Sequence, residues 1–167
     1  MRAVRALEGG DADALQLLLE SLPSYSIQIT GYPPGPSDAL SALISVPPYF
    51  DRTQKIGLGL WEGDMLVGFA DVLLGYPEPA VAYIGLLAVH RDRQRRGLGR
   101  ELHEGVVSLA RQTSGVDRLR LGTVATTAPV AEPFWSALAY RPTGEVKPYV
   151  YDHLSSTVAM WERKLSS

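Results

Sequence analysis

The sequence has no cysteine, no long apolar run and no large excess of either charge. The absence of cysteine excludes disulfides, thiolate zinc sites and a cysteine nucleophile. None of the three histidines has a metal-ligand partner at the usual spacing, so no metal site is expected. No apolar run reaches the ~18–20 residues of a membrane span, and the N-terminus has no signal-peptide segment. We therefore expect a cytoplasmic protein that does not bind membranes.

The charge balance and length restrict the class of protein further. The formal net charge is −2, which argues against a nucleic-acid-binding protein held by bulk positive charge. Hydrophobic residues make up 46% of the chain and charged residues 20%, values typical of a globular protein. A chain of 167 residues without an internal repeat or linker fits one domain of ~100–200 residues. We expect a single domain over residues 1–167.

The hydrophobic pattern predicts a mixed α/β sheet flanked by helices. Its centre is a strand–loop–helix–strand unit, which should cross over in the right-handed sense. The strand at 81–89 is almost continuously apolar, as expected of a central strand buried on both faces. The expected strands are 2–7 (an edge strand), 55–62, 65–74, 81–89, 119–124, one beginning near Tyr140, and 157–165. Four helices are expected: one that carries Leu15 to Leu22, one that starts at Ser37 or Asp38, one from the glycine loop as far as Gly115, and one over 130–138. Residues 25–36 are expected to form a loop.

The loop at 94–99, Gln-Arg-Arg-Gly-Leu-Gly, links an apolar strand to an amphipathic helix. The first N–H groups of a helix lack intrahelical partners, and the helix dipole adds positive charge there, so anions bind at this end. Glycine lets the backbone approach such a ligand closely. Five arginines lie within ten residues, at 91, 93, 95, 96 and 100. In a nearly neutral protein this cluster favours a small polyanion as the ligand.

The same loop matches a motif of a known family. It lacks the frames of a P-loop and of a dinucleotide fold, but it resembles the Q/R-x-x-G-x-G/A pattern of the GNAT superfamily of N-acetyltransferases. The apolar segment 84–89 is similar to that family's fourth strand. Residues 133–140, Pro-Phe-Trp-Ser-Ala-Leu-Ala-Tyr, resemble its helix-to-strand junction. The order of elements matches over nearly the whole chain.

The resemblance implies that acetyl-CoA is the donor and that an amine of a small molecule or a peptide attacks it directly, without a covalent enzyme intermediate. It places the pyrophosphate at the loop and the pantetheine beside the fourth strand, where a backbone N–H would polarise the thioester carbonyl. A non-catalytic domain that binds or senses acyl-CoA is the alternative. The implied cofactor-binding residues are Leu87, Ala88, Val89, Gln94, Arg95, Arg96, Gly97, Leu98, Gly99 and Arg100.

The sequence departs from the family at polar positions on the acceptor side. Trp135 stands where the family usually has a tyrosine that protonates the thiolate, and an indole N–H has no usable acidity. Ala128 stands in place of a frequent asparagine, and Gly85 and Leu86 stand where carboxylates are common. No catalytic residue can therefore be assigned by resemblance.

Other residues are only weak candidates for the acceptor side. His90 could act as a base near neutral pH, although an exposed loop histidine is the simpler interpretation, and Tyr83 could line the acceptor site. An aromatic wall near residues 149–153, with Tyr149, Tyr151, Asp152 and His153, is a further possibility. Prolines and aromatics at 32–36 and 47–50 favour a small amine or an amino-acid-like acceptor over a polycation.

Several residues receive structural interpretations instead. We expect packing roles for Trp135 and Tyr140, and a position on the polar face of its helix for His103. The carboxylates Asp71, Glu62 and Glu78 are expected to face solvent. The last strand, 157–165, is a candidate edge through which a homodimer could form.

Overall fold

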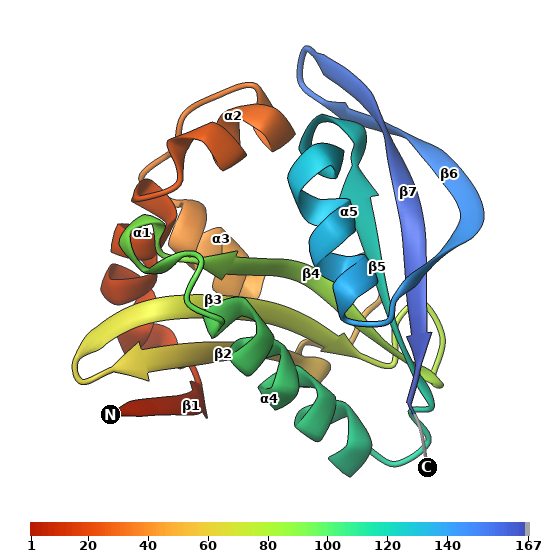
Figure 1. The fold of residues 1–167 in the computed structure, drawn as a ribbon, viewed down its shortest axis with the longest axis horizontal. Helices are drawn as coiled ribbons and strands as arrows, with labels where there is room; N and C mark the ends of the chain where they lie inside the picture. The colour runs from red at the N-terminus through yellow and green to blue at the C-terminus, as the bar shows by residue number, and fades with distance from the viewer. Residues whose placement is uncertain (166–167) are drawn as a thin grey trace.

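A seven-stranded mixed sheet forms the centre of the computed structural model, which describes residues 1–165 (Figure 1). The strand order is β1-β2-β3-β4-β5-β7-β6, and all neighbours are antiparallel except β4 and β5. The strands are β1 (Arg2–Ala6), β2 (Lys55–Glu62), β3 (Met65–Leu74), β4 (Val81–Val89), β5 (Arg118–Val124), β6 (Arg141–Tyr151) and β7 (Leu154–Lys164). The prediction of a mixed α/β sheet is confirmed, and the bounds of β2, β3 and β4 agree with the predicted ones.

Helices cover both faces of this sheet (Figure 1). On one face α4 lies across β2, β3 and β4, and its residues Leu98, Leu102 and Val106 are buried at the spacing of one helix face. On the other face α1 and α3 enclose a second apolar cluster around Phe69. The α-helices are α1 (Ala12–Glu20), α2 (Pro23–Thr30), α3 (Asp38–Ile44), α4 (Leu98–Gln112) and α5 (Ala128–Ala137). None of the helices within residues 1–165 is long and apolar enough to cross a membrane.

The predicted loop at 25–36 is wrong in its first part, because α2 occupies Pro23–Thr30. Pro23 is the first residue of this helix. Its fixed φ suits the first turn, where its missing N–H costs nothing. Gly31 ends α2 in the left-handed region at φ 82°. No residue of α2 is fully buried, so the hydrophobic pattern gave no signal for this helix.

The strand predicted at 157–165 is present, but the prediction that it forms an edge of the sheet is wrong. The strand that covers it, β7, is inserted between β5 and β6 and pairs with both, so β6 is the edge of the sheet on this side. The reason is topological: β6 and β7 form a hairpin, and the second strand of that hairpin returns to fill the place beside β5. Any pairing between copies at this end of the sheet would involve β6.

Candidate functional site

The sheet opens between β4 and β5. These parallel strands pair only through residues 81–84 and 118–121, whereas β3 stays paired with β4 as far as Val89. Beyond Ile84 the backbone of β4 therefore has no strand partner on its β5 side. Gly85, which is exposed, marks the start of this gap. The expectation that this strand is covered on both faces is confirmed even in its second half, where Leu87 and Val89 pack against one apolar cluster and Leu86 and Ala88 against the other; only its edge towards β5 is open.

A bulge in β4 coincides with the opening. Asp71 on β3 pairs with Leu86, but the next residue, Val72, pairs with Ile84, so Gly85 is the extra residue on β4. A bulge bends its strand and increases the local twist. It therefore helps to separate β4 from β5 and leaves main-chain groups of β4 available to a ligand.

The arginine–glycine loop lies at the end of β4 and leads into α4. Two of its residues have left-handed backbone conformations, Arg95 at φ 64° and Gly97 at φ 76°. Gly97 is the N-cap of α4, and no side chain caps the helix there. Successive N–H groups in such a turn form a concave anion site. A Cβ on Gly97 would meet no atom within 4 Å, so the space beside this residue is open. This geometry fits a phosphate-bearing ligand.

Polar contacts attach this loop to the sheet. The Arg93 Nε donates to Glu62 Oε1 on β2 at 2.8 Å, and Arg93 holds the pKa of Glu62 below its usual value. The Gln94 side chain donates to the Val89 carbonyl at 3.1 Å. His90 accepts a hydrogen bond at Nδ1 from the Asp92 N–H at 3.1 Å, which gives this half-buried histidine a capping role. The remaining loop arginines, Arg91, Arg95, Arg96 and Arg100, are exposed.

An aromatic cluster supports the start of α4 from the side of α5. A Cβ on Gly99 would lie 3.0 Å from the Phe134 ring, so glycine permits the close approach of the two helices. Trp135 packs edge-on against Phe134 and Tyr140, with ring centroids 4.9 and 5.1 Å apart. Trp135 and Tyr140 are both buried in the core, which confirms the packing roles predicted for them.

His103 on α4 belongs to the same cluster, so its predicted position on the polar face is wrong. Its side chain is 1% exposed, and its Nε2 shares a 2.8 Å hydrogen bond with the Tyr140 hydroxyl. Burial, aided by the charges of Arg163 and Arg100, lowers the pKa of His103 to about 4. The histidine side chain is tolerated here because it is neutral and has a polar partner.

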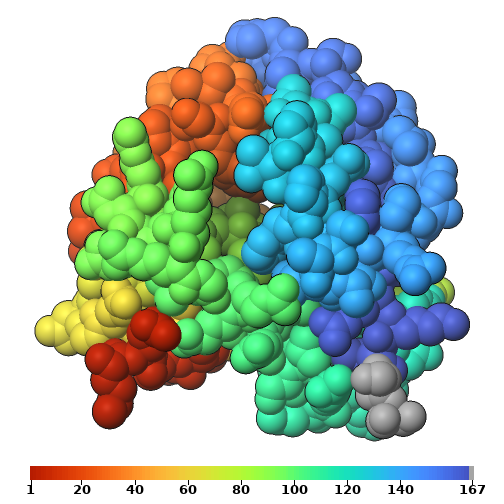
Figure 2. Space-filling view, viewed as in Figure 1, coloured from red at the N-terminus to blue at the C-terminus, as the bar shows by residue number. Residues whose placement is uncertain are grey.

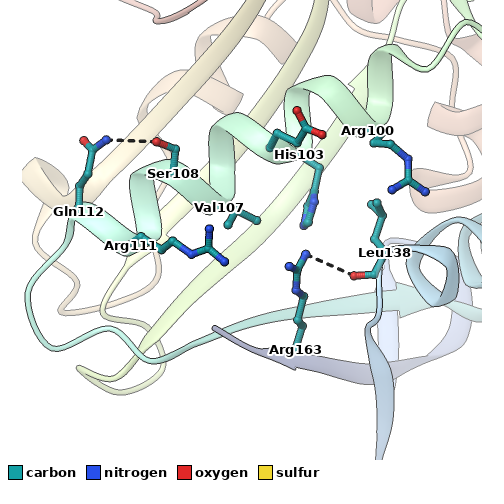
Figure 3. Close-up of a pocket in the computed structure, with 9 residues that line it drawn as sticks. Arg100, His103, Val107, Ser108, Arg111, Gln112, Leu138 and Arg163 are labelled. Carbon is teal, nitrogen blue, oxygen red and sulfur yellow. Dashed lines mark hydrogen bonds between the residues drawn. The ribbon is translucent and has the colours of Figure 1, made fainter. Parts of the chain in front are cut away.

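A cavity of about 450 Å³ runs along α4 beside this histidine (Figure 3). Arginines from α4 and β7 point into it, and Arg163 donates to the Leu138 carbonyl at 3.4 Å. It is lined by Arg100, His103, Glu104, Val107, Ser108, Arg111, Gln112, Leu138 and Arg163. None of these residues comes from β4 or from the diverging part of β5, so this cavity is separate from the opening between the strands.

The helix α2 and the turn of the β6–β7 hairpin lie at the same end of the molecule (Figure 1), and side-chain contacts connect them. The Tyr32 hydroxyl, in the loop after α2, contacts Asp152 and His153 in the turn. The Tyr149 hydroxyl donates to the Ile29 carbonyl. Residues 149–153, expected near the acceptor, therefore hold α2 in place; an aromatic wall around the acceptor itself stays a prediction. Figure 2 shows a hollow between α2, the loop before α4, and α5, and its floor has the colour of the β4 region.

A row of aromatic rings flanks the opening where the two strands begin to separate. Phe50, Tyr76 and Tyr83 pack edge to face, with successive centroids 5.8 and 5.4 Å apart. The Tyr83 hydroxyl reaches towards β5, where a Cβ on Gly122 would lie 3.4 Å from it. Burial raises the pKa of Tyr83. Tyr83 thus lies at the base of the gap between the strands.

The expectation that Asp71 faces solvent is wrong. Its side chain is 17% exposed, and Oδ1 lies 2.9 Å from the Nζ of Lys55, which is 5% exposed. The two charges are at ion-pair distance, although their geometry is not that of a hydrogen bond. Burial raises the pKa of Asp71, while the Lys55 charge acts in the opposite direction. A signal was present in the sequence, because Asp71 is the single charged residue in an otherwise apolar strand. The other two carboxylates differ: Glu78 is mostly exposed and pairs with Arg118, and Glu62 is partly exposed.

A sheet that opens beside an uncapped helix N-terminus has a shape that suits an extended, phosphate-bearing ligand. Comparison with known proteins gives the particular family. A profile described as acetyltransferase (GNAT) family matches residues 22–140, and the chain belongs to this family. It is accordingly an acyltransferase enzyme, and the family in general uses acetyl-CoA.

Solved structures agree with this assignment over nearly the whole chain. An acetyltransferase from Thermus thermophilus is 28% identical to this chain, with a TM-score of 0.75; the match covers 99% of this chain and 97% of the Thermus thermophilus chain. The ribosomal-protein-S18-alanine N-acetyltransferase from Escherichia coli has 19% identity, coverages of 100% and 96%, and a TM-score of 0.72. An N-acetyltransferase from Staphylococcus aureus has 16% identity, coverages of 99% and 99%, and a TM-score of 0.74. At 19% and 16% identity, the Escherichia coli and Staphylococcus aureus structures show a similar fold and nothing more. A search of curated proteins gave no match.

Proposed function

We propose that this enzyme transfers the acetyl group of acetyl-CoA to a primary amine of a small molecule or a peptide. The observation that carries the proposal is the early end of the β4–β5 pairing, directly before the uncapped N-terminus of α4. The gap offers unpaired main-chain groups to an extended arm, and the helix offers N–H groups to phosphates. The unpaired part of β4, which would bind the pantetheine arm, is followed directly along the chain by the start of α4, which would bind the pyrophosphate.

The residues proposed for the donor act mainly through the backbone. Leu87, Ala88 and Val89 lie on the part of β4 that has lost its partner on the β5 side. The left-handed turns at Arg95 and Gly97 direct N–H groups to one side of the loop. The arginine side chains add a positive field that salt screens. The full set proposed for the donor is Leu87, Ala88, Val89, Gln94, Arg95, Arg96, Gly97, Leu98, Gly99 and Arg100.

The transfer needs no covalent enzyme intermediate. The amine nitrogen forms a bond to the acetyl carbon while the carbon–sulfur bond breaks, and the coenzyme leaves as a thiol. An ammonium substrate loses two protons in the process, one to the sulfur and one to solvent. A backbone N–H of β4 placed at the thioester oxygen would stabilise the charge that develops there, a contribution of about 3 kcal/mol to the barrier.

A small amine is the acceptor that the surroundings favour. Aromatic rings rather than a cluster of carboxylates flank the gap, and a polycation would need several negative charges. One similar fold acts on a protein N-terminus, since the Escherichia coli enzyme is named for the alanine of ribosomal protein S18. A peptide acceptor therefore belongs in the same screen. A panel of amines, assayed for the thiol that each turnover releases, tests the proposal; binding of acetyl-CoA without turnover of any amine would contradict it and would favour a non-catalytic acyl-CoA-binding domain.

The donor site has its own test, in two matched glycine variants. Gly97 and Gly115, at opposite ends of α4, have φ values of 76° and 85°, and a Cβ on either meets nothing within 4 Å. A glutamate therefore causes the same backbone strain at both positions. Only Gly97→Glu places bulk and negative charge against a pyrophosphate, where like charges cost several kcal/mol, so coenzyme A affinity should fall by about 100-fold or more. Calorimetry should show this loss for Gly97→Glu but not for Gly115→Glu; equal affinities would mean that the pyrophosphate binds elsewhere.

A further inference from the structure

The chain has no carboxylate on β4 itself, but a carboxylate from the neighbouring strand fills the space beside it. A Cβ built on Gly85 would lie 2.8 Å from Asp71 Oδ2 and 3.6 Å from Asp71 Cγ. The glycine therefore leaves room for the Asp71 carboxylate, which reaches across from β3. Because Gly85 is the bulged and exposed residue at the start of the gap, this carboxylate lies at the edge of the opening.

The two oxygens of Asp71 have different surroundings. Oδ1 is buried and lies at ion-pair distance from Lys55, whose Nζ also donates to the Ser45 carbonyl at 2.7 Å. Within residues 1–165 no hydrogen bond to Oδ2 is found, and this is the oxygen that faces Gly85. Lys55 thus fixes the carboxylate through one oxygen and leaves the other available to a ligand.

The neighbours of this free oxygen suit a cation with a flat apolar group. Tyr83 precedes Gly85 by two residues on β4 and pairs with Leu73, which follows Asp71 by two residues on β3. The Tyr83 ring continues through Tyr76 to Phe50. An ammonium group at Asp71 would therefore have an aromatic wall along one side, where ring faces also attract cations.

We propose that Asp71 Oδ2 receives the ammonium group of the acceptor and that the acceptor is a small primary amine carrying an apolar or aromatic group. This assignment rests on the proposed amine acetylation. The carboxylate orients the nitrogen beside β4, next to the proposed donor position, and can take up the proton that the ammonium must lose before attack and pass it to water. Burial, which raises the pKa of Asp71, makes it a better proton acceptor than an exposed aspartate.

The test compares Asp71→Asn with Asp64→Asn, the same change at an exposed aspartate in the β2–β3 turn. Benzylamine is the first acceptor probe, and benzyl alcohol, which has a similar shape and no charge, is a competitor. Loss of a hydrogen bond between charged groups should raise the KM for benzylamine by about 10- to 100-fold in Asp71→Asn. The KM for acetyl-CoA, and inhibition by benzyl alcohol, should stay unchanged, and Asp64→Asn should behave as the wild type.

Asp71→Asn leaves the buried Lys55 without a partner charge and can reduce stability, so Gly85→Ala is the second variant. It keeps the Asp71–Lys55 pair but places a methyl group 2.8 Å from the present position of Oδ2, so that the carboxylate must move. It should also raise the KM for benzylamine without changing that for acetyl-CoA. An unchanged KM for benzylamine in both variants would overturn the role of Asp71 while the proposed function stands. Equal weakening of the binding of benzylamine and of benzyl alcohol would have the same consequence. If the wild type acetylates neither benzylamine nor any other amine in the panel, the proposed function fails, and the role of Asp71 with it.

Discussion

The buried histidine of α4 leads to a quantitative prediction about pH and stability. In the folded protein the pKa of His103 is lowered from 6.5 to about 4 by burial and by the charges of Arg163 and Arg100. The unfolded chain has the ordinary value, so as the pH falls below about 6.5 the unfolded state takes up a proton that the folded state does not. Stability linked to His103 is therefore fully present at neutral pH and is lost progressively as the pH falls towards 4.

The magnitude follows from the same two values. Each pKa unit corresponds to 1.36 kcal/mol, so the difference between 6.5 and about 4 corresponds to roughly 3 kcal/mol. The variant His103→Gln removes the titrating group and keeps a side chain that can bond the Tyr140 hydroxyl. The free energy of unfolding of the wild type minus that of His103→Gln should therefore fall by about 3 kcal/mol between pH 7 and pH 4. Carboxylates that titrate in this range do so in both proteins and cancel in the difference.

Urea unfolding at a series of pH values measures this difference. Tyr140→Phe serves as the control, because it removes the hydrogen bond to His103 but keeps the buried imidazole. It should destabilise the protein by about 1–3 kcal/mol, the cost of an unsatisfied buried polar group, while keeping the wild-type dependence on pH. A stability difference between wild type and His103→Gln that is constant with pH would refute the argument that burial keeps His103 neutral.

Two further predictions test the packing and the acceptor side. A Cβ on Gly59 would lie 2.6 Å from Leu7 and 2.8 Å from Leu66, so Gly59→Ala should cost about 1–3 kcal/mol in thermal or urea unfolding; unchanged stability would mean that these side chains move aside freely. Tyr149→Phe removes the hydrogen bond to the Ile29 carbonyl, which should loosen α2 and raise the acceptor KM more than the acetyl-CoA KM in steady-state kinetics. An equal rise in both would contradict a role confined to the acceptor side.

The features that could be predicted from the sequence depend on local patterns. The strands at 55–62, 65–74 and 81–89 are apolar segments bounded by turn residues, and their bounds agree with the structure. The helix after the glycine loop has a regular apolar face, as α4 does. The left-handed N-cap at Gly97 is a position that glycine tolerates best. In each case the interactions that decide the conformation lie within a few residues along the chain.

The features that escaped prediction depend on residues far apart in the sequence. The helix α2 has no fully buried residue and is held by contacts such as that between Tyr149 and Ile29, which lie 120 residues apart. His103 is buried because Tyr140, 37 residues later, supplies a polar partner. The position of β7 between β5 and β6 follows from strand pairing across the sheet, which hydrophobic periodicity does not encode.

The same distinction separates the two halves of the candidate site. The proposed donor half uses main-chain groups, so the sequence reveals it through glycines and a helix start, whichever side chains surround them. The proposed acceptor half depends on side chains that the sheet brings together from different strands. In the sequence, Gly85 indicates only that β4 lacks a carboxylate at this position. In the structure, the absence of a side chain on Gly85 leaves room for the carboxylate of Asp71, which reaches across from β3. A change at either position should therefore alter acceptor binding and leave the donor site unchanged.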